Sequence, residues 1–260
     1  MKLQDAVCIV TGSASGIGAA CAIELARRGC RTVINYSKSK DAAEETVKAC
    51  QAAGSDAIAV QADVSQDADC LRLVETTLAK WGQVNGLVNN AGTTKFAHHA
   101  DLDALSSDDF LRIYSTNVVG AYQMIRAVTP TMKKQGEGAI VNMSSIAAVT
   151  GIGSSVAYAA SKGALNTMTL SLARVLAPEI RVNGICPGFV DTAWLRQGLG
   201  DRYANTKASY EKRAPLQKVS TPEDVADTVI WLLTGARSVT GEFIIVDGGF
   251  HLGGAPSKAR

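Results

Sequence analysis

The sequence has little of several features that would point quickly to a function. It contains 3 histidines and 6 cysteines, without a Cys-x-x-Cys pair, and carries a net charge of only +2 over 260 residues. His98 and His99 are adjacent and cannot share a helical face, so we expect no metal site. The small net charge predicts neither a nucleic-acid nor an anionic-membrane partner. Scattered cysteines are typical of reduced core residues, so a cytoplasmic location is expected.

The chain also lacks long apolar runs and a Gly-x-Ser-x-Gly elbow. Its opening stretch, MKLQDAVCIVTGSASG, has an apolar run too short for a signal-peptide core or a membrane-spanning helix. Without the elbow, and without a well-placed histidine, a Ser/His/Asp hydrolase is disfavoured. Apolar residues make up 47% and charged residues 19%, as in ordinary globular proteins. No repeat or linker divides the chain, so we expect one dinucleotide-binding catalytic domain over residues 1–260.

Short β-branched runs alternate with longer stretches of helical periodicity. Two of these stretches, 40–54 and 66–82, end at glycine, as helix C-termini often do. Strands that are apolar on both faces and separated by helices indicate a parallel sheet covered on each side. We therefore predict a single-domain α/β fold, a Rossmann-type doubly wound parallel sheet of about seven strands. The predicted strands are 6–10, 31–35, 56–60, 86–89, 139–143, 180–185 and 243–246.

A glycine-rich turn, TGSASGIG at 11–18, follows the first predicted strand and opens a helix. Gly12, Gly16 and Gly18 would let the backbone turn tightly and approach a pyrophosphate. The free N–H groups of the helix that follows would face the phosphates. Alone, the stretch also fits an ordinary strand-to-helix turn, although its Gly-x-x-x-Gly-x-Gly spacing is more diagnostic than a lone glycine motif.

Other strand ends carry groups suited to a dinucleotide. Asp63 can accept a hydrogen bond from an adenine amino group while Val64 covers the ring, but an Asp here is also a good helix N-cap. NNAG at 89–92 and CPGFVDT at 186–192 end later strands, and each is also compatible with a plain turn. In an open α/β sheet, ligands bind at the carboxyl ends of the strands, where all these loops fall.

Tyr158 and Lys162 stand one helical turn apart in SSVAYAASKGAL, among small residues. A packing stripe would use Leu or Ile, and a solvated face would carry more charge. Free tyrosine has a pKa of about 10, and a nearby ammonium, together with the positive nicotinamide of an oxidised cofactor, favours the phenolate. We therefore expect a lowered Tyr158 pKa at a reaction site, with Ser145 of IVNMSS converging on the same carbonyl.

In combination these elements resemble the short-chain dehydrogenase/reductase family, and within it the 3-oxoacyl-carrier-protein reductase-like group. The match runs through TGSASGIG, Asp63, NNAG, Asn117, Ser145, YAASK, PGFVDT and VDGG at 246–249. The resemblance implies an NAD(P)(H)-dependent oxidoreductase that transfers hydride between nicotinamide and a carbonyl or secondary alcohol, on a small-molecule or acyl-thioester substrate. The alternatives are a polyol, sugar or steroid alcohol dehydrogenase, and a non-catalytic dinucleotide-binding regulator, which would not need the intact catalytic positions.

By the same resemblance, Tyr158 would donate a proton to the carbonyl oxygen and Ser145 would polarise that oxygen. Lys162 would tune Tyr158 and bind the nicotinamide ribose, and Asn117 would hold a water that relays protons to Lys162. The expected cofactor-binding residues are Gly12, Ser13, Ser15, Gly16, Ile17, Gly18, Tyr36, Ser37, Lys38, Asp63, Val64, Asn90, Ala91, Gly92, Tyr158, Lys162, Pro187, Gly188, Val190 and Thr192.

The end of the second predicted strand, TVINYSKSK, bears on cofactor choice. Enzymes that select NAD place an acid there, where this chain has Tyr36. Ser37 can donate to a 2′-phosphate and Lys38 can neutralise it, so NADP(H) is the expected preference, with NAD(H) possible. The alternative is a solvated turn beside a stacking Tyr36.

The segment 191–215 is charged and contains two glycines, so we expect it to be a partly mobile lid over substrate and nicotinamide. Residues 93–100 and 147–156 would complete the substrate pocket. Resemblance to the family implies a homotetramer in which the helices carrying Asn117 and Tyr158 pair across a two-fold axis, with Gly163 permitting close approach.

Overall fold

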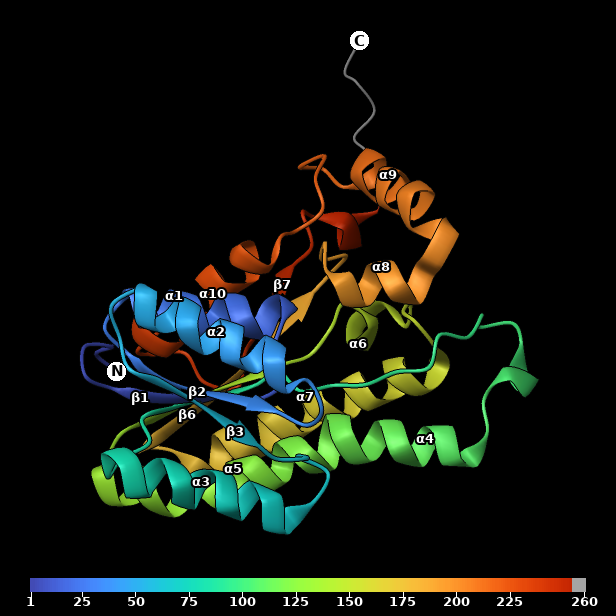
Figure 1. The fold of residues 1–260 in the computed structure, drawn as a ribbon. Helices are drawn as coiled ribbons and strands as arrows, with labels where there is room; N and C mark the ends of the chain where they lie inside the picture. The colour runs from blue at the N-terminus through green and yellow to red at the C-terminus, as the bar shows by residue number, and fades with distance from the viewer. Residues whose placement is uncertain (254–260) are drawn as a thin grey trace.

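The computed structural model describes residues 1–253, and residues 254–260 of the expected domain lie outside this part. The predicted fold class is confirmed, because seven parallel strands form one sheet in the order β3-β2-β1-β4-β5-β6-β7 (Figure 1). Each predicted run forms a strand, with bounds shifted by about one or two residues, as usual for strand ends. The strands are β1 (Val7–Val10), β2 (Arg31–Tyr36), β3 (Ala57–Gln61), β4 (Gly86–Asn89), β5 (Gly138–Met143), β6 (Ile180–Pro187) and β7 (Phe243–Val246).

Helices cover both faces of the sheet, which explains why its strands are mostly apolar. In Figure 1 one layer lies above the sheet and the other below it. Cys8 and Val10 of β1 pack into the first layer, and Ile9 packs into the second. The first layer is α1 (Gly16–Arg27), α2 (Lys40–Ala52) and α10 (Pro222–Thr234). The second is α3 (Asp67–Trp81), α5 (Gly120–Gln135) and α7 (Val156–Leu176).

Local sequence signals set several helix ends. Gly82 ends α3 in the left-handed region at φ 72°, as the pattern predicted, and a capping box of Thr221 and Asp224 starts α10. All six cysteines are buried, as expected. Within residues 1–253, no helix has the length and apolar character needed to cross a membrane.

Shorter elements lie at the carboxyl edge of the sheet. α4 (Ser107–Tyr114) continues through a π-helical turn, η2 (Ser115–Val119), into α5. The segment after β6 forms α8 (Ala193–Leu199), η3 (Gly200–Arg202) and α9 (Tyr203–Arg213), and it rises over this edge in Figure 1. Three small elements complete the fold: η1 (Leu102–Ala104), α6 (Ala147–Thr150) and η4 (Phe250–Leu252).

Candidate active site

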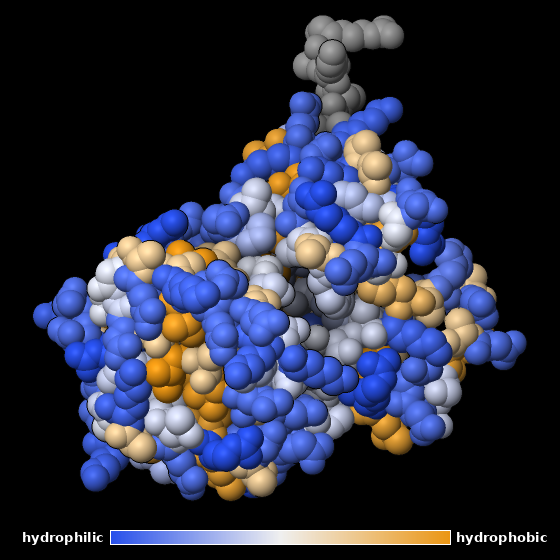
Figure 2. All heavy atoms as spheres, in the orientation of Figure 1, coloured by the Kyte–Doolittle hydropathy of each residue, from blue (hydrophilic) through white to orange (hydrophobic). Residues whose placement is uncertain are grey.

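The carboxyl ends of the strands open into one cleft of about 1340 Å³. Figure 2 shows it as a hollow between the main body and the overhanging segment after β6. Most of the residues predicted from the sequence meet on its walls. They are Gly12, Ser15, Gly16, Ile17, Ser37, Lys38, Asp63, Val64, Asn90, Ala91, Gly92, Ser145, Tyr158, Lys162, Pro187, Gly188, Val190 and Thr192.

The glycine-rich loop and the NNAG loop form one unit. The Thr11 hydroxyl accepts from the backbone N–H groups of Asn90 and Ala91, both at 3.0 Å. The Asn90 amide donates to the Gly12 carbonyl at 2.9 Å. A Cβ added to Gly12, which has φ +60°, would lie 2.8 Å from the Ala91 Cα, so only glycine allows this approach. The two loops therefore form one hydrogen-bonded surface on which a ligand can bind.

Asn35 is a residue that sequence reasoning missed. It is only 2% exposed, its side-chain oxygen accepts from the Gly12 N–H at 3.1 Å, and its amide donates to the Ala62 carbonyl at 3.0 Å. It thus ties the ends of β2 and β3 to the glycine loop. The one signal in the sequence is a polar residue inside an apolar run, since buried polar groups are normally hydrogen-bonded.

Four predicted site residues do not reach the cleft wall. Ser13 is fully buried and donates to the Val10 carbonyl at 2.6 Å, so it stabilises the glycine-rich loop from inside the protein rather than contacting a ligand. A Cβ added to Gly18 would lie 2.6 Å from the Asn90 amide nitrogen, so this glycine serves the packing of the two loops. Tyr36 packs against the apolar core of the first helix layer. The fourth is Asn117, which is buried behind the wall.

The start of α1 fits a phosphate-bearing ligand. The helix begins at Gly16, its N-cap Ser15 makes no side-chain cap, and its first turn carries no acid. Its first N–H groups are therefore available to an anion. A Cβ on Gly16 would lie 3.7 Å from the Thr192 methyl, so the lid begins just across a narrow gap. With Ser37 and Asp63 further along the cleft, these residues fit a dinucleotide.

Tyr158 and Lys162 lie together at the other end of the cleft, on the first turns of α7. The Ser155 hydroxyl caps this helix by accepting from the Tyr158 N–H at 3.2 Å. The Lys162 ammonium lies 5.6 Å from the centre of the Tyr158 ring and donates to the Met143 carbonyl at 2.7 Å. The lysine is thus held between β5 and the phenol, as the one-turn spacing predicted.

Burial dominates the electrostatics of this pair. It raises the pKa of Tyr158 to about 12, and the influence of the Ser145 hydroxyl only partly opposes it. Burial also lowers the pKa of Lys162 to about 8, so its ammonium stays mostly charged at neutral pH. Without cofactor, desolvation therefore sets the direction of the Tyr158 pKa, and the expected lowering, which also needs the positive nicotinamide of the oxidised cofactor, stays a prediction. Near neutral pH the phenol keeps its proton.

Asn117 lies in the π-helical turn η2, and its side chain holds the loop after β4. Its oxygen accepts from the Thr93 N–H at 2.7 Å, and its amide donates to the Thr93 carbonyl at 3.0 Å and to the Ser161 hydroxyl at 2.9 Å. A Cβ on Gly92 would lie 3.4 Å from this oxygen and 3.6 Å from the Lys162 nitrogen. The side chain therefore orders the backbone next to Lys162.

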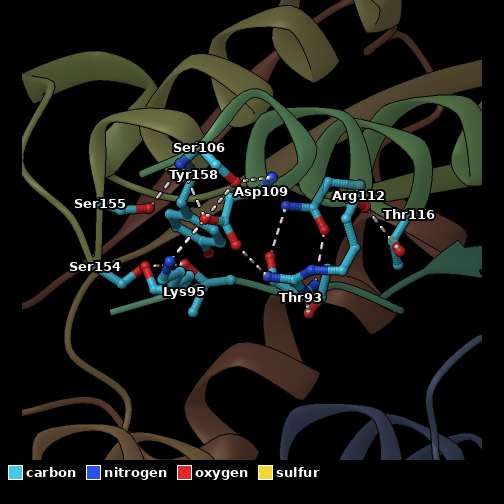
Figure 3. A network of polar contacts seen from close by, with 11 residues as sticks. Thr93, Lys95, Ser106, Asp109, Arg112, Thr116, Ser154, Ser155 and Tyr158 are labelled. Carbon is cyan, nitrogen blue, oxygen red and sulfur yellow. Dashed lines mark hydrogen bonds and ion pairs between the residues drawn. The ribbon is translucent and has the colours of Figure 1, made fainter. Parts of the chain in front are cut away.

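An ionic network fixes the same loop further out (Figure 3). Lys95 donates to Asp109 at 2.7 Å, and Asp109 forms the capping box of α4 with Ser106. The bond from Lys95 and the cap hold the pKa of Asp109 well below its usual range. Arg112 reaches the Thr93 hydroxyl at 3.1 Å and lines the cleft. Sequence reasoning missed this network, because its members are far apart along the chain.

Several side chains of the lid segment 191–215 bind the carboxylate of one residue, Asp191. Asp191 accepts from Arg196 of α8 at 2.5 Å, from the Tyr203 hydroxyl at 2.5 Å and from Lys207 of α9 at 2.9 Å. These bonds, led by that of Tyr203, lower the pKa of Asp191 to about 2. The backbone N–H of Asp191 also donates to the Ser220 carbonyl at 3.0 Å, which fastens the carboxylate to the sheet edge.

A doubly wound parallel sheet, with a glycine loop and a Tyr/Lys pair at its carboxyl edge, defines the class of Rossmann-type oxidoreductases. Comparisons with known proteins identify the family within this class. A family model described as enoyl-(acyl carrier protein) reductase matches residues 12–251. The chain belongs to the short-chain dehydrogenase/reductase family, and it is an NAD(P)-dependent dehydrogenase or reductase.

Similar proteins include two curated relatives and two solved structures. The protein named ketoacyl reductase 2 of the granaticin polyketide synthase, from Streptomyces violaceoruber, is 41% identical over 95% of this chain and 96% of its own. A 3-oxoacyl-acyl-carrier-protein reductase of Staphylococcus epidermidis is 34% identical over 94% and 98%. A Burkholderia xenovorans short-chain dehydrogenase/reductase has TM-score 0.90 and 40% identity over 96% and 99%. An NAD⁺-bound xylitol dehydrogenase has TM-score 0.88 and 30% identity over 96% and 100%.

Proposed function

We propose that the protein reduces a ketone, in the manner of a 3-oxoacyl reductase, with Tyr158 as the proton donor. The observation that carries this proposal is the phenol itself. Burial keeps the phenol protonated, and it lines the cleft together with Ser145 and the glycine loop. A group that must donate a proton to a carbonyl oxygen near neutral pH needs to be in its acid form. The arrangement therefore fits a proton donor to a ketone oxygen.

The chain's own residues have distinct tasks in this proposal. The bound nicotinamide cofactor supplies the hydride. Tyr158 donates its proton to the substrate oxygen while the Ser145 hydroxyl holds that oxygen in place. Lys162, anchored on the Met143 carbonyl, has further N–H groups for the ribose hydroxyls. Asn117 positions Thr93 and the nearby Gly92 backbone, and a water relay through it stays a prediction.

NADP(H) is the proposed preference. Ser37 and Lys38 line the cleft, whereas Lys40 turns to Glu44 on the exposed side of α2 at 3.6 Å. The Gln61 amide donates to the Ser37 carbonyl at 3.0 Å, which fixes the turn that carries the two residues. An ammonium here neutralises a 2′-phosphate. The structural relative crystallised with NAD⁺ supports the alternative, an enzyme that uses NAD(H).

The test compares kcat/KM for NADPH and NADH with one good ketone. We expect NADPH to be favoured, and Lys38→Ala to lose most of that preference. Lys40→Ala is the matched control and should leave the ratio unchanged. A wild-type enzyme that favours NADH, or a Lys38→Ala variant with the wild-type ratio, would overturn the assignment.

The substrate class is tested with purified enzyme on 3-oxoacyl thioesters, simple ketones and polyols, by following cofactor absorbance. Reduction of thioesters or ketones with little oxidation of polyols is expected. Polyol oxidation alone would favour the alternative, a polyol dehydrogenase. Turnover of none of these compounds, with cofactor binding intact, would favour a dinucleotide-binding regulator.

The lid remains part of the proposal. Segment 191–215 overhangs the cleft, and its position depends on the contacts of Asp191. We expect it to be the most mobile internal segment in the cofactor-free protein and to become ordered when cofactor binds.

A homotetramer is supported by apolar side chains exposed on α4, α5 and α7. Phe110, Leu111, Tyr114 and Tyr122 are exposed on α4 and α5, and Leu170 is exposed on α7. A Cβ on Gly163 of α7 would meet nothing within 4 Å in the monomer. If α7 pairs across a two-fold axis, Gly163→Leu should break the assembly without unfolding the chain. Light scattering checks this, and a monomeric wild type at micromolar concentration would refute it.

A further inference from the structure

Trp194 lies where a substrate must approach Tyr158. It stands in the first turn of α8, and its ring centre is 6.4 Å from that of Tyr158, with the planes at 43°. The indole lines the cleft and is 46% exposed. Leaving that much apolar surface in water is unfavourable, so a ligand that covered it would gain binding free energy.

The indole of Trp194 packs against a second aromatic ring. Phe96, from the loop after β4, lies 5.5 Å from it at an interplanar angle of 52°. Phe96 fits there only because residue 198 is glycine, since a Cβ on Gly198 would lie 2.0 Å from the Phe96 ring. The start of α8 is fixed as well, because the Thr192 hydroxyl accepts from the Leu195 N–H at 3.3 Å. The indole therefore presents an apolar face to the cleft.

Other apolar side chains belong to the wall of the same cleft. Leu195 and Leu199 of α8 line the cleft with it, as does Ile152 from the loop before α7. A flat aromatic face among aliphatic side chains favours a planar, apolar group, because ring pairs with centres about 4.5–7 Å apart gain energy beyond the burial of area.

We propose that Trp194 is a specificity-determining residue that stacks on a planar ring next to the reacting carbonyl. The favoured substrates are then ketones whose carbonyl adjoins an aromatic or conjugated ring, rather than saturated chains of similar size. This inference rests on the proposed function, because it takes Tyr158 as the site of reduction.

The test uses ketones of equal carbon skeleton. β-Tetralone carries an aromatic ring, and β-decalone is its saturated counterpart. We expect the wild-type enzyme to prefer β-tetralone in kcat/KM, and Trp194→Leu to reduce that preference about fivefold. Trp194→Phe restores a ring and should keep most of the preference. Trp231→Leu removes an indole that is equally exposed, at 45%, but lies on α10 outside the cleft, and should change nothing.

A second readout does not need turnover. β-Naphthol, a planar alcohol, should quench tryptophan fluorescence in the wild type and in Trp231→Leu, and much less in Trp194→Leu. If no ketone is reduced but this quenching persists, the proposed function fails while the planar-ring site stands. Equal losses for both ketones in Trp194→Leu, an altered KM for NADPH alone, or quenching that does not depend on Trp194 would each overturn the inference.

Discussion

Replacing one oxygen of the lid carboxylate tests how the overhanging segment is held. Asp191→Asn keeps the size of the side chain but removes the charge that Arg196 and Lys207 share. The amide can still accept from the Tyr203 hydroxyl, so the local fold should survive. We expect the lid to open more often.

The magnitude follows from the pKa. The pKa of the Asp191 carboxyl falls from 3.8 to about 2, and the hydrogen bond from Tyr203 is the largest cause. Each pKa unit corresponds to about 1.4 kcal/mol. The Asp191 side chain is 18% exposed, so solvent screening removes part of this stabilisation. About 2 kcal/mol in favour of the closed lid remains. Because the folded pKa is depressed, the contribution is full above pH 3.8 and lost as the pH falls toward 2. At neutral pH, about 2 kcal/mol corresponds to roughly a thirtyfold change in the ratio of closed to open lid.

The assay is hydrogen exchange of the α8 and α9 amides at neutral pH. We expect exchange there to speed up by between tenfold and thirtyfold in Asp191→Asn, and KM for the ketone to rise more than kcat falls. Asp201→Asn is the control, because Asp201 is an exposed acid on the same lid. Unchanged exchange in Asp191→Asn, or an equal effect in Asp201→Asn, would refute the assignment of Asp191 as the anchor.

Two further predictions follow from the site. Lys162 has its pKa lowered by burial to about 8 and is charged below that pH, so kcat/KM for reduction should fall as the pH rises through about 8. A flat profile to pH about 10 would contradict this, and Lys162→Arg should move the fall to higher pH. In Gly18→Ala the new Cβ would lie 2.6 Å from both the Asn90 amide and the Gly12 carbonyl. This should cost about 1–3 kcal/mol of unfolding free energy and raise KM for the cofactor, so an unchanged melting temperature would count against the packing role of Gly18.

The strands and the loops at their ends could be predicted because their signals are local. β1 is buried on both faces, so it appears in the sequence as an unbroken apolar run. The glycines of TGSASGIG and the one-turn spacing of Tyr158 and Lys162 are also local patterns. They place the dinucleotide cleft and the reaction site at one edge of the sheet.

Contacts between distant segments could not be predicted in the same way. The hydrogen bonds of Asn35 reach across two strands to the glycine loop. The π-helical turn places Asn117 against Thr93 and Ser161, and nothing in its own sequence specifies that register. The pKa of Tyr158 in the absence of cofactor depends on burial by residues from several elements, which the spacing of Tyr158 and Lys162 does not reveal.

The most direct test of the central claim is ketone reduction by Tyr158→Phe with NADPH. This change removes only the hydroxyl that would donate the proton, and a positioned acid usually contributes at least about a hundredfold to the rate. We predict a fall in kcat of at least that size, with cofactor affinity within about threefold of the wild type by fluorescence titration, a free-energy change well below 1.4 kcal/mol. A variant that kept more than about a tenth of the wild-type kcat would contradict the assignment of Tyr158 as the proton donor.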